Sequence, residues 1–177
     1  SWAPPTTVRT RLALVRHGAT AHSAQNRFSG RNELPLSPDG VQQATQLGKR
    51  AWPRAVAVVS SPLRRAVETA EAIAGPLGLA VETMDDLIET DFGVWEGSTF
   101  AEAAATDPDT MRSWHNSLEV APPGGESFAA VAERVQRARS AICDAHPDGA
   151  VVVVTHVTPI KLLVCAALEA SPIALFR

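Results

Sequence analysis

The stretch that decides the fold is Leu12-Ala13-Leu14-Val15-Arg16-His17-Gly18, in which four apolar residues run directly into an arginine, a histidine and a glycine. The apolar run predicts a buried strand that ends at a polar site. In an open α/β sheet, residues just past the carboxyl end of a strand face the crevice where ligands bind. For this stretch taken alone, a strand that ends in two ordinary polar residues is an equally good interpretation.

The same pattern recurs near the other end of the chain, where Val151-Val152-Val153-Val154 runs into Thr155-His156. The expected strands cover residues 12–15, 56–59, 79–84 and 151–154, and the expected helices cover about residues 37–50, 63–74, 99–114, 128–142 and 158–168. Alternating strands and helices predict a mostly parallel sheet covered on both faces. The expected fold class is therefore α/β, a three-layer α/β/α sandwich.

Two of the expected helices carry clear start signals. Ser37 and Ser127 are expected N-caps, and Pro38 suits the first helical position after Ser37. In the first of these helices Val41, Ala44 and Leu47 are expected to face the core. The alanine-rich stretch 99–114 is expected to be one helix, either a lid over the crevice or a surface insertion. Residues 19–36 and 85–97 are expected to be loops beside the site.

Length and composition describe one ordinary globular domain. The chain has 177 residues, 45% hydrophobic and 20% charged, with a net charge of −3. No basic run predicts nucleic-acid binding, and no apolar run reaches the roughly 18 residues of a membrane span. Prolines stand where a signal peptide needs apolar residues, so a cytoplasmic protein is expected. Cys143 and Cys165 are expected to be buried free thiols.

The two ends of the chain differ from the rest. Residues 1–10, which begin Ser1-Trp2-Ala3-Pro4-Pro5, are expected to be a linker or a cloning remnant. Residues 11–177 are expected to form the domain, with a truncated C-terminal end, because residues 173–177 resemble a helix exit or a strand cut short. The chain is therefore expected to be part of a longer protein, fused to another domain at its N-terminus. An edge strand could also pair two copies into a homodimer.

Several polar residues are expected to converge at one edge of the sheet. Arg65 and its neighbour Arg64 fall in the first turn of a helix, where the dipole disfavours cations unless an anion binds there. Two solvated arginines are the alternative. Arg16, Arg65 and the histidines offer nitrogen donors that match a dianionic phosphate, so a small phosphate ester is the expected ligand. A metal site is the weaker hypothesis, because the arginines would repel a cation, and no cofactor is expected.

A set of ordered motifs also resembles the histidine phosphatase superfamily, in its phosphoglycerate mutase-like branch, over nearly the whole chain. The motifs are Arg16-His17-Gly18, Asn26-Arg27-Phe28-Ser29-Gly30, Pro35-Leu36-Ser37-Pro38-Asp39-Gly40, Ser61-Pro62-Leu63-Arg64-Arg65-Ala66 with Thr69-Ala70, Asp91-Phe92-Gly93-Val94-Trp95-Glu96-Gly97 and Pro123-Gly124-Gly125-Glu126-Ser127. Within this family the chain is most similar to α-ribazole phosphatase-like acid phosphatases and to the phosphatase half of bifunctional ribonuclease H/acid phosphatases.

The resemblance implies metal-independent phosphomonoester hydrolysis through a phosphohistidine. Carried over by position, His17 would be the nucleophile and Glu89 the proton donor. Arg16, Arg65 and His156 would hold the phosphoryl oxygens. The positions at which the family places further phosphate or substrate contacts are, in this chain, those of Ser23, Ser29 and Gly30. A phosphohistidine replaces one hard displacement by two easier ones, and the positive groups stabilise the charge on the equatorial oxygens.

The chain departs from the family pattern at three places. Thr155-His156-Val157 stands where the family has Ser-His-Gly, Ala19 where a glutamate is common and Ser23 where an asparagine is common. These departures bear on the substrate more than on the reaction, and the leaving group is expected to be chosen by residues 19–31 and 100–123. Two alternative functions stay open: a phosphoglycerate mutase, and a non-catalytic phosphate-binding domain.

Overall fold

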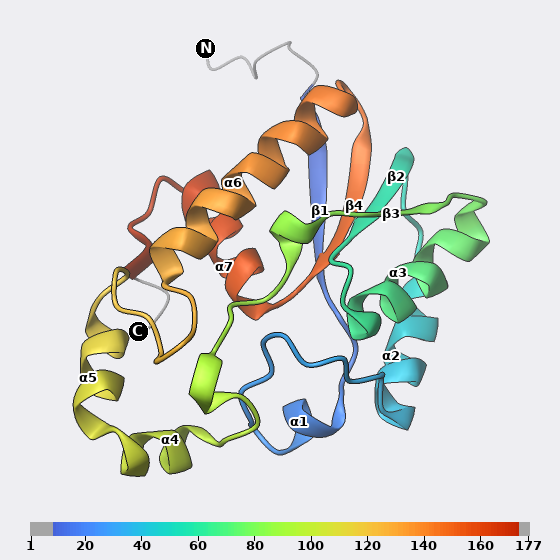
Figure 1. Cartoon of the computed structure of the whole chain (residues 1–177). Coiled ribbons are helices and arrows are strands. Elements are labelled where there is room, and N and C mark those ends of the chain that lie inside the picture. Colours follow the sequence, from blue (N-terminus) through green and yellow to red (C-terminus); the bar gives the residue numbers. More distant parts are fainter. Residues whose placement is uncertain (1–8, 174–177) are drawn as a thin grey trace, which may run out of the picture.

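The computed structural model describes residues 9–173, and its centre is a sheet of four parallel strands. The strands are β1 (Arg11–Arg16), β2 (Ala55–Ser60), β3 (Val81–Thr83) and β4 (Ala150–Thr155), in the spatial order β1-β4-β2-β3. Helices cover both faces of this sheet (Figure 1). The predicted three-layer α/β/α architecture is confirmed. Most of the expected linker and of the apolar C-terminal end, at residues 1–8 and 174–177, lies outside the described residues.

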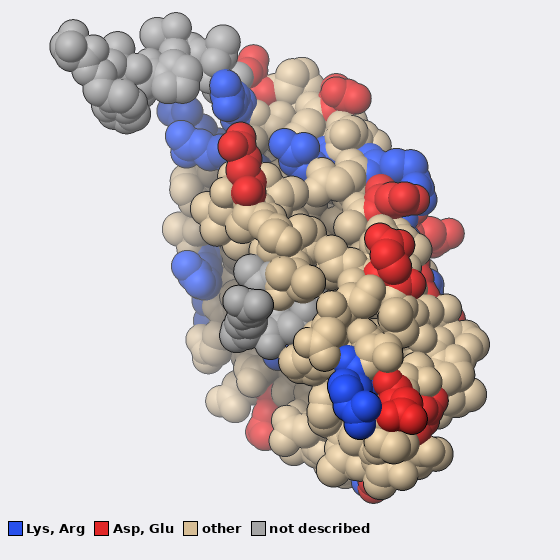
Figure 2. Space-filling model, turned by 90° about the vertical axis from the view of Figure 1, so that its left-hand side faces the viewer, with Lys and Arg blue, Asp and Glu red and all other residues tan. Residues whose placement is uncertain are grey.

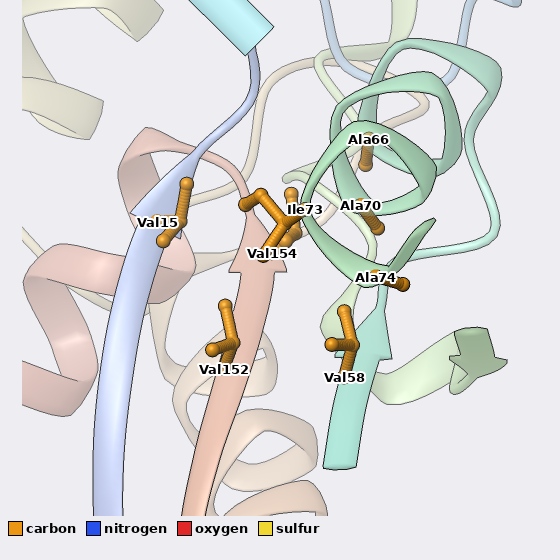
Figure 3. Close-up of a cluster of buried hydrophobic side chains, with 8 residues drawn as sticks. All are labelled: Val15, Val58, Ala66, Ala70, Ile73, Ala74, Val152 and Val154. Atoms are coloured by element: carbon orange, nitrogen blue, oxygen red, sulfur yellow. The ribbon is translucent and has the colours of Figure 1, made fainter. Parts of the chain in front are cut away.

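The two faces of the sheet bury alternate residues of the same strands. On one face Val152 and Val154 of β4 pack against α3 (Arg64–Leu77), where Ile73 is fully buried (Figure 3). On the other face Val151 and Val153 pack against α6 (Phe128–Ala145). Side chains of a strand alternate between faces, so an unbroken run of valines fills both cores. This explains why β4 is hydrophobic throughout.

The helices are arranged in two outer layers. The helices α2 (Pro38–Gly48) and α3 lie on one side of the sheet, and α6 and α7 (Val157–Ala167) on the other (Figure 1). The side chains of Ser37 and Ser127 cap α2 and α6, as predicted. Val41 is 53% exposed, however, so its predicted place in the core was wrong. In α2 it is Ala44 that is buried, with Leu47 partly buried against the core.

A third hydrophobic cluster lies beyond the carboxyl ends of the strands. The stretch expected to be a single helix over 99–114 forms two helices, α4 (Phe100–Thr106) and α5 (Pro108–Asn116). The prediction of one helix was wrong because a proline disfavours helical geometry in the residue before it, and the Asp107 side chain caps the second helix instead. Met111 and Trp114 of α5 are buried in this cluster.

Four smaller predictions also need correction. The helix expected to end near residue 74 runs to Leu77, because the left-handed residue that ends it is Gly78, at φ 66°. The loop at 19–36 contains a short helix, α1 (Ala21–Ala24), and the loop at 85–97 contains two 3₁₀ turns at Asp85–Leu87 and Gly93–Trp95. Cys143 is only partly buried, although both cysteines are free as expected.

The charged residues of the surface bear on the expectation of no nucleic-acid binding, and the helices on the expectation of no membrane span. Figure 2 shows lysines and arginines interspersed with aspartates and glutamates over the visible face, with no continuous basic band among the residues it colours. Within residues 9–173, no helix is long and apolar enough to cross a bilayer.

Candidate active site

Two histidines from neighbouring strands face each other at the carboxyl edge of the sheet. Arg16 at the end of β1 is in register with Thr155 at the end of β4, and the amide of His17 donates to the Thr155 carbonyl over 3.1 Å. The next residue after each strand is a histidine, so the pairing brings His17 and His156 together, with ring centroids 5.0 Å apart. The structure thus unites residues that are far apart in sequence.

The hydrogen bond of His17 determines which of its ring nitrogens is free. Its Nδ1 lies 2.7 Å from the carbonyl oxygen of Gly18. A carbonyl oxygen can only accept, so Nδ1 carries the proton and Nε2 presents a lone pair. Burial lowers the pKa of His17 to about 4, against the opposing effect of the Gly18 hydrogen bond, and the charges of Arg65 and Arg16 add to the lowering. His17 is therefore neutral at physiological pH.

The second histidine lies deeper in the protein. His156 is fully buried, and its Nε2 lies 2.8 Å from the hydroxyl oxygen of Ser61. Its Nδ1 is buried without a hydrogen-bond partner among the described residues. Burial, followed by the charges of Arg65 and His17, holds the pKa of His156 well below its ordinary value.

Arg65 is a buried arginine whose guanidinium holds the loop over the site. Its two terminal nitrogens donate to the carbonyls of Asn32, Ser29 and Gly30 over 2.7, 3.1 and 2.9 Å. Its Nε is buried and has no partner among the residues that the structure describes. Burial also lowers the pKa of Arg65. The amide of Gly30 donates to the carboxylate of Glu96, so this backbone segment is fixed from both sides.

Arg64 fits the alternative interpretation of this pair of arginines, in which the side chain is solvated. Its side chain is 60% exposed and forms an ion pair with Glu68 one turn along α3, at 2.7 Å. Its amide donates to the carboxylate of Glu33 over 3.0 Å, and this negative charge interacts favourably with the positive end of the α3 dipole. Of the two adjacent arginines, only Arg65 turns inward.

Glu89 lies in the loop 85–97, and its buried carboxyl group contacts the N-terminus of α7. Its Oε1 accepts from the amide of Thr90 over 2.9 Å and its Oε2 from the amide of Thr158 over 3.3 Å. Burial raises the pKa of Glu89, although these hydrogen bonds and the charge of Arg65 act in the opposite direction. A carboxyl group with a raised pKa keeps its proton to higher pH and can act as an acid.

A cavity of about 180 Å³ brings most of the predicted residues together. Its lining includes Arg16, His17, Ser23, Ser29 and Glu89. The more deeply buried Arg65, His156 and Gly30 are not among the lining residues of this cavity. This volume is large enough for a small anion beside His17.

The two serines already make hydrogen bonds within their own loops. The hydroxyl of Ser23 donates to the Thr20 carbonyl over 2.9 Å and accepts from the Thr20 amide over 2.7 Å. The hydroxyl of Ser29 donates to the side-chain oxygen of Asn32 over 2.7 Å. Each serine can also donate to a ligand in the cavity if its hydroxyl rotates.

A second cavity of about 200 Å³ adjoins the first and shares Phe28, Phe92, Val157 and Thr158 with it. Trp114 and His115 of α5 also line it. Part of the segment 100–123 therefore lies beside the site, and its role in choosing the leaving group stays a prediction. Among the described residues, no group of three His, Cys, Asp or Glu side chains could hold a metal ion.

The sequence interpretation missed Arg134, which is buried in α6 and binds the backbone around Glu89. A signal was present, because Val131, Val135 and Ala138 form a buried helical stripe and Arg134 falls on that stripe. A charged residue on an apolar face needs a partner inside the protein.

Comparison with known proteins gives a family match, a curated relative and two solved structures. The family model of the histidine phosphatase superfamily (branch 1) matches residues 12–177. The bifunctional protein Rv2228c of Mycobacterium tuberculosis is 49% identical over 172 residues, which are 95% of this chain and 47% of that protein. The chain thus spans about half the length of this relative.

Two solved structures share the fold. The mycobacterial glucosyl-3-phosphoglycerate phosphatase Rv2419c in complex with VO3 superposes with a TM-score of 0.85 at 33% identity, over 94% of this chain and 85% of that one. A putative alpha-ribazole-5'-P phosphatase from Escherichia coli superposes with a TM-score of 0.86 at 28% identity, over 95% of this chain and 84% of that one.

Proposed function

Because the chain belongs to the histidine phosphatase superfamily (branch 1), we propose that it hydrolyses phosphate monoesters through a phosphohistidine on His17. One observation carries the proposal. A neutral imidazole with a free Nε2 lines the same cavity as a carboxyl group whose pKa is raised. A nucleophile and a proton donor beside one small cavity are what stepwise phosphoryl transfer requires.

In the first step the lone pair of His17 Nε2 attacks phosphorus as the bond from phosphorus to the ester oxygen breaks. The proton of Glu89 passes to the departing oxygen, which leaves as an alcohol. The Nδ1–H of His17 stays hydrogen-bonded to the Gly18 carbonyl, and this bond stabilises the positive charge that the ring acquires. The products of this step are a phosphorylated His17, an ionised Glu89 and the free alcohol.

In the second step a water molecule attacks the phosphoryl group as the bond from Nε2 to phosphorus breaks. Glu89, now ionised, takes a proton from the water and regains its starting state. Inorganic phosphate leaves and His17 is again neutral. The same carboxyl group therefore serves as acid and then as base, as a two-step displacement requires.

The phosphoryl oxygens are proposed to lie between Arg16, Arg65 and His156, with Ser23, Ser29 and Gly30 around them. Two buried nitrogens support this placement, Nε of Arg65 and Nδ1 of His156, which have no partner among residues 9–173. Unpaired buried polar groups are rare in native proteins, and a phosphoryl oxygen is the acceptor that an arginine Nε–H needs. One structural neighbour was solved in complex with VO3, which supports the proposal that this chain also takes an anionic ligand.

The test is the hydrolysis of para-nitrophenyl phosphate in excess EDTA by the wild type, His17→Ala, Glu89→Gln and a His146→Ala control. His146 is the C-cap of α6, outside the proposed site. We expect metal-independent turnover by the wild type and the control. His17→Ala should lose all turnover, and Glu89→Gln should lose roughly 10²- to 10⁴-fold.

Mass spectrometry at alkaline pH, where phosphohistidine survives, should detect one phosphoryl group on the His17 peptide. Glu89→Gln should accumulate this species, since it can still expel a good leaving group but lacks the base for the second step. Turnover that survives in His17→Ala would overturn the proposal. No turnover by the wild type on any phosphate ester would favour a mutase or a phosphate-binding domain.

A further inference from the structure

Arg134 is buried in α6, and the N–H groups of its guanidinium donate hydrogen bonds to two groups of partners. Its side chain is only 9% exposed, and Nε and one terminal nitrogen grip the carboxylate of Glu126 over 2.8 and 3.0 Å. This two-pronged pairing is the strongest geometry available to an arginine and a carboxylate.

The other partners of Arg134 are backbone carbonyls on the segment that leads into Glu89. The guanidinium donates to the carbonyls of Asp86, Ile88 and Glu89 over 2.9, 2.6 and 3.1 Å. Glu89 and Ile88 belong to no helix or strand. Since no ladder of backbone hydrogen bonds holds this segment, the guanidinium supplies the donors that its carbonyls need.

Glu126 is itself fixed, so it can orient Arg134. A terminal nitrogen of Arg31 donates to its carboxylate over 3.3 Å, and its amide donates to the Asp91 carbonyl over 2.9 Å. Burial acts to raise the pKa of Glu126, but the hydrogen bond and charge of Arg134 hold it below its ordinary value. Glu126 is therefore ionised at neutral pH, where it pairs with Arg134.

The two ends of Glu89 are thus held by different elements. Thr90 and Thr158 donate to its carboxyl group, whereas Arg134 donates to its backbone carbonyl. A proton donor has to lie within hydrogen-bond reach of the departing oxygen, and a shift of about 1 Å can cost on the order of 10²-fold in rate. The backbone position of Glu89 therefore matters as much as its pKa.

We propose that Arg134, oriented by Glu126, is a positioning residue that sets Glu89 at the distance needed to protonate the leaving group. The inference rests on the proposed function, in which Glu89 is the proton donor. It also gives a role to the Gly124-Gly125-Glu126 turn, which delivers the carboxylate that orients Arg134.

The experiment compares kcat/KM for a series of phosphate monoesters whose leaving groups range from good to poor: dinitrophenyl, para-nitrophenyl, phenyl and an alkyl group. A poor leaving group needs protonation by Glu89, whereas dinitrophenolate departs without it. The ratio kcat/KM reports only steps up to the departure of the leaving group. The proteins are the wild type, Glu89→Gln, Arg134→Met and Arg134→Lys.

We expect Arg134→Met to lose about 10- to 100-fold in kcat/KM on phenyl and alkyl phosphates and no more than about 3-fold on dinitrophenyl phosphate. Glu89→Gln should show the same trend more strongly. Arg134→Lys should lose less kcat/KM than Arg134→Met. Its ammonium group can reach some of the same acceptors, but it cannot form all the hydrogen bonds of the planar guanidinium.

The control is Arg137→Gln, which alters the next arginine on the same helix. Arg137 is 63% exposed and bonds the side chain of Asp86 rather than the backbone before Glu89. Its substitution should leave kcat/KM within about 2-fold for every leaving group, because an exposed ion pair contributes little.

The outcomes separate this inference from the proposed function. Equal losses by Arg134→Met on all leaving groups, with the expected trend in Glu89→Gln, would overturn the positioning role alone. A flat response in Glu89→Gln would instead overturn the role of Glu89 as proton donor. If Arg134→Met does not fold, the same leaving-group series is measured with Arg134→Lys and Glu126→Gln. Equal losses of kcat/KM on all leaving groups in both variants would also overturn the positioning role.

Discussion

The hydroxyl of Thr69 accepts a hydrogen bond from the amide of Gly18 over 3.0 Å in the interior of the protein, and it donates to the carbonyl of Arg65 over 2.8 Å. The carbonyl of the same Gly18 accepts the Nδ1–H of His17. One hydroxyl on α3 therefore ties Gly18, the residue whose carbonyl orients the proposed nucleophile, to the turn of helix that carries Arg65.

Thr69→Val keeps the shape of the side chain and removes this link. The Gly18 amide is then buried without an acceptor, which should cost about 1–3 kcal/mol of unfolding free energy. His17 loses its orientation, so kcat should fall with little change in KM. Chemical denaturation and steady-state kinetics measure the two effects, and Thr69→Ser, which retains the hydroxyl, should behave like the wild type. A fully active Thr69→Val would contradict the link.

Gly40→Ala should damage both stability and activity, because α2 packs its backbone directly on the loop that follows β1. A Cβ at Gly40 would collide with the carbonyl of Ala19. We expect a loss of roughly 1–3 kcal/mol. The matched control is Gly75→Ala in α3, where a Cβ meets nothing within 4 Å, and this change should stabilise by up to about 1 kcal/mol. Thermal unfolding of both variants decides whether the close approach matters.

The rate of hydrolysis should have a bell-shaped pH dependence. Activity needs neutral His17, whose pKa is lowered to about 4, so the acid limb should lie near that pH. Activity also needs protonated Glu89, so the rate should fall as the pH rises through the raised pKa of that carboxyl group. The measurement is kcat/KM for phenyl phosphate against pH. A rate that rises steadily above about pH 8 would refute the role of Glu89.

Stability should decline in acid because of His17. Its pKa is about 4 in the folded protein and near 6.5 in the unfolded chain, so between these values the unfolded chain binds more protons. The contribution of His17 to stability is therefore complete above pH 6.5 and is lost as the pH falls towards 4. The unfolding free energy of His17→Asn should fall less steeply over this window than that of the wild type. Parallel curves from urea denaturation would disprove the assignment.

Much of the fold was predictable because strong local signals agreed with the global pattern. The apolar runs before His17 and His156 predict two buried strands, and their parallel pairing brings the two residues to one edge. The family and the fold class are confirmed by the match over residues 12–177 and by the structure. The roles of the site residues, the fusion to another domain, the homodimer and the cytoplasmic location stay predictions.

What escaped prediction depends on long-range contacts. Nothing local distinguishes Arg64 from Arg65, yet only the second is buried, because its direction is set by carbonyls of the loop around Gly30. The position of Arg134 on the apolar stripe of α6 indicates burial, but its partners come from the backbone before Glu89, which meets α6 only in the folded protein. The break between α4 and α5 was readable in principle, since Asp107 precedes a proline and can cap the next helix.

The position of β4 in the sheet has a consequence for folding. Among residues 9–173, β4 is the last strand in sequence, yet it lies between β1 and β2, which have no other neighbour in common. During synthesis the earlier strands emerge without the one that joins them, so a native sheet can assemble only after about residue 155 has been made. An unfinished chain can thus neither close its core nor bring His17 beside His156, so the proposed active site can form only once β4 has joined the sheet.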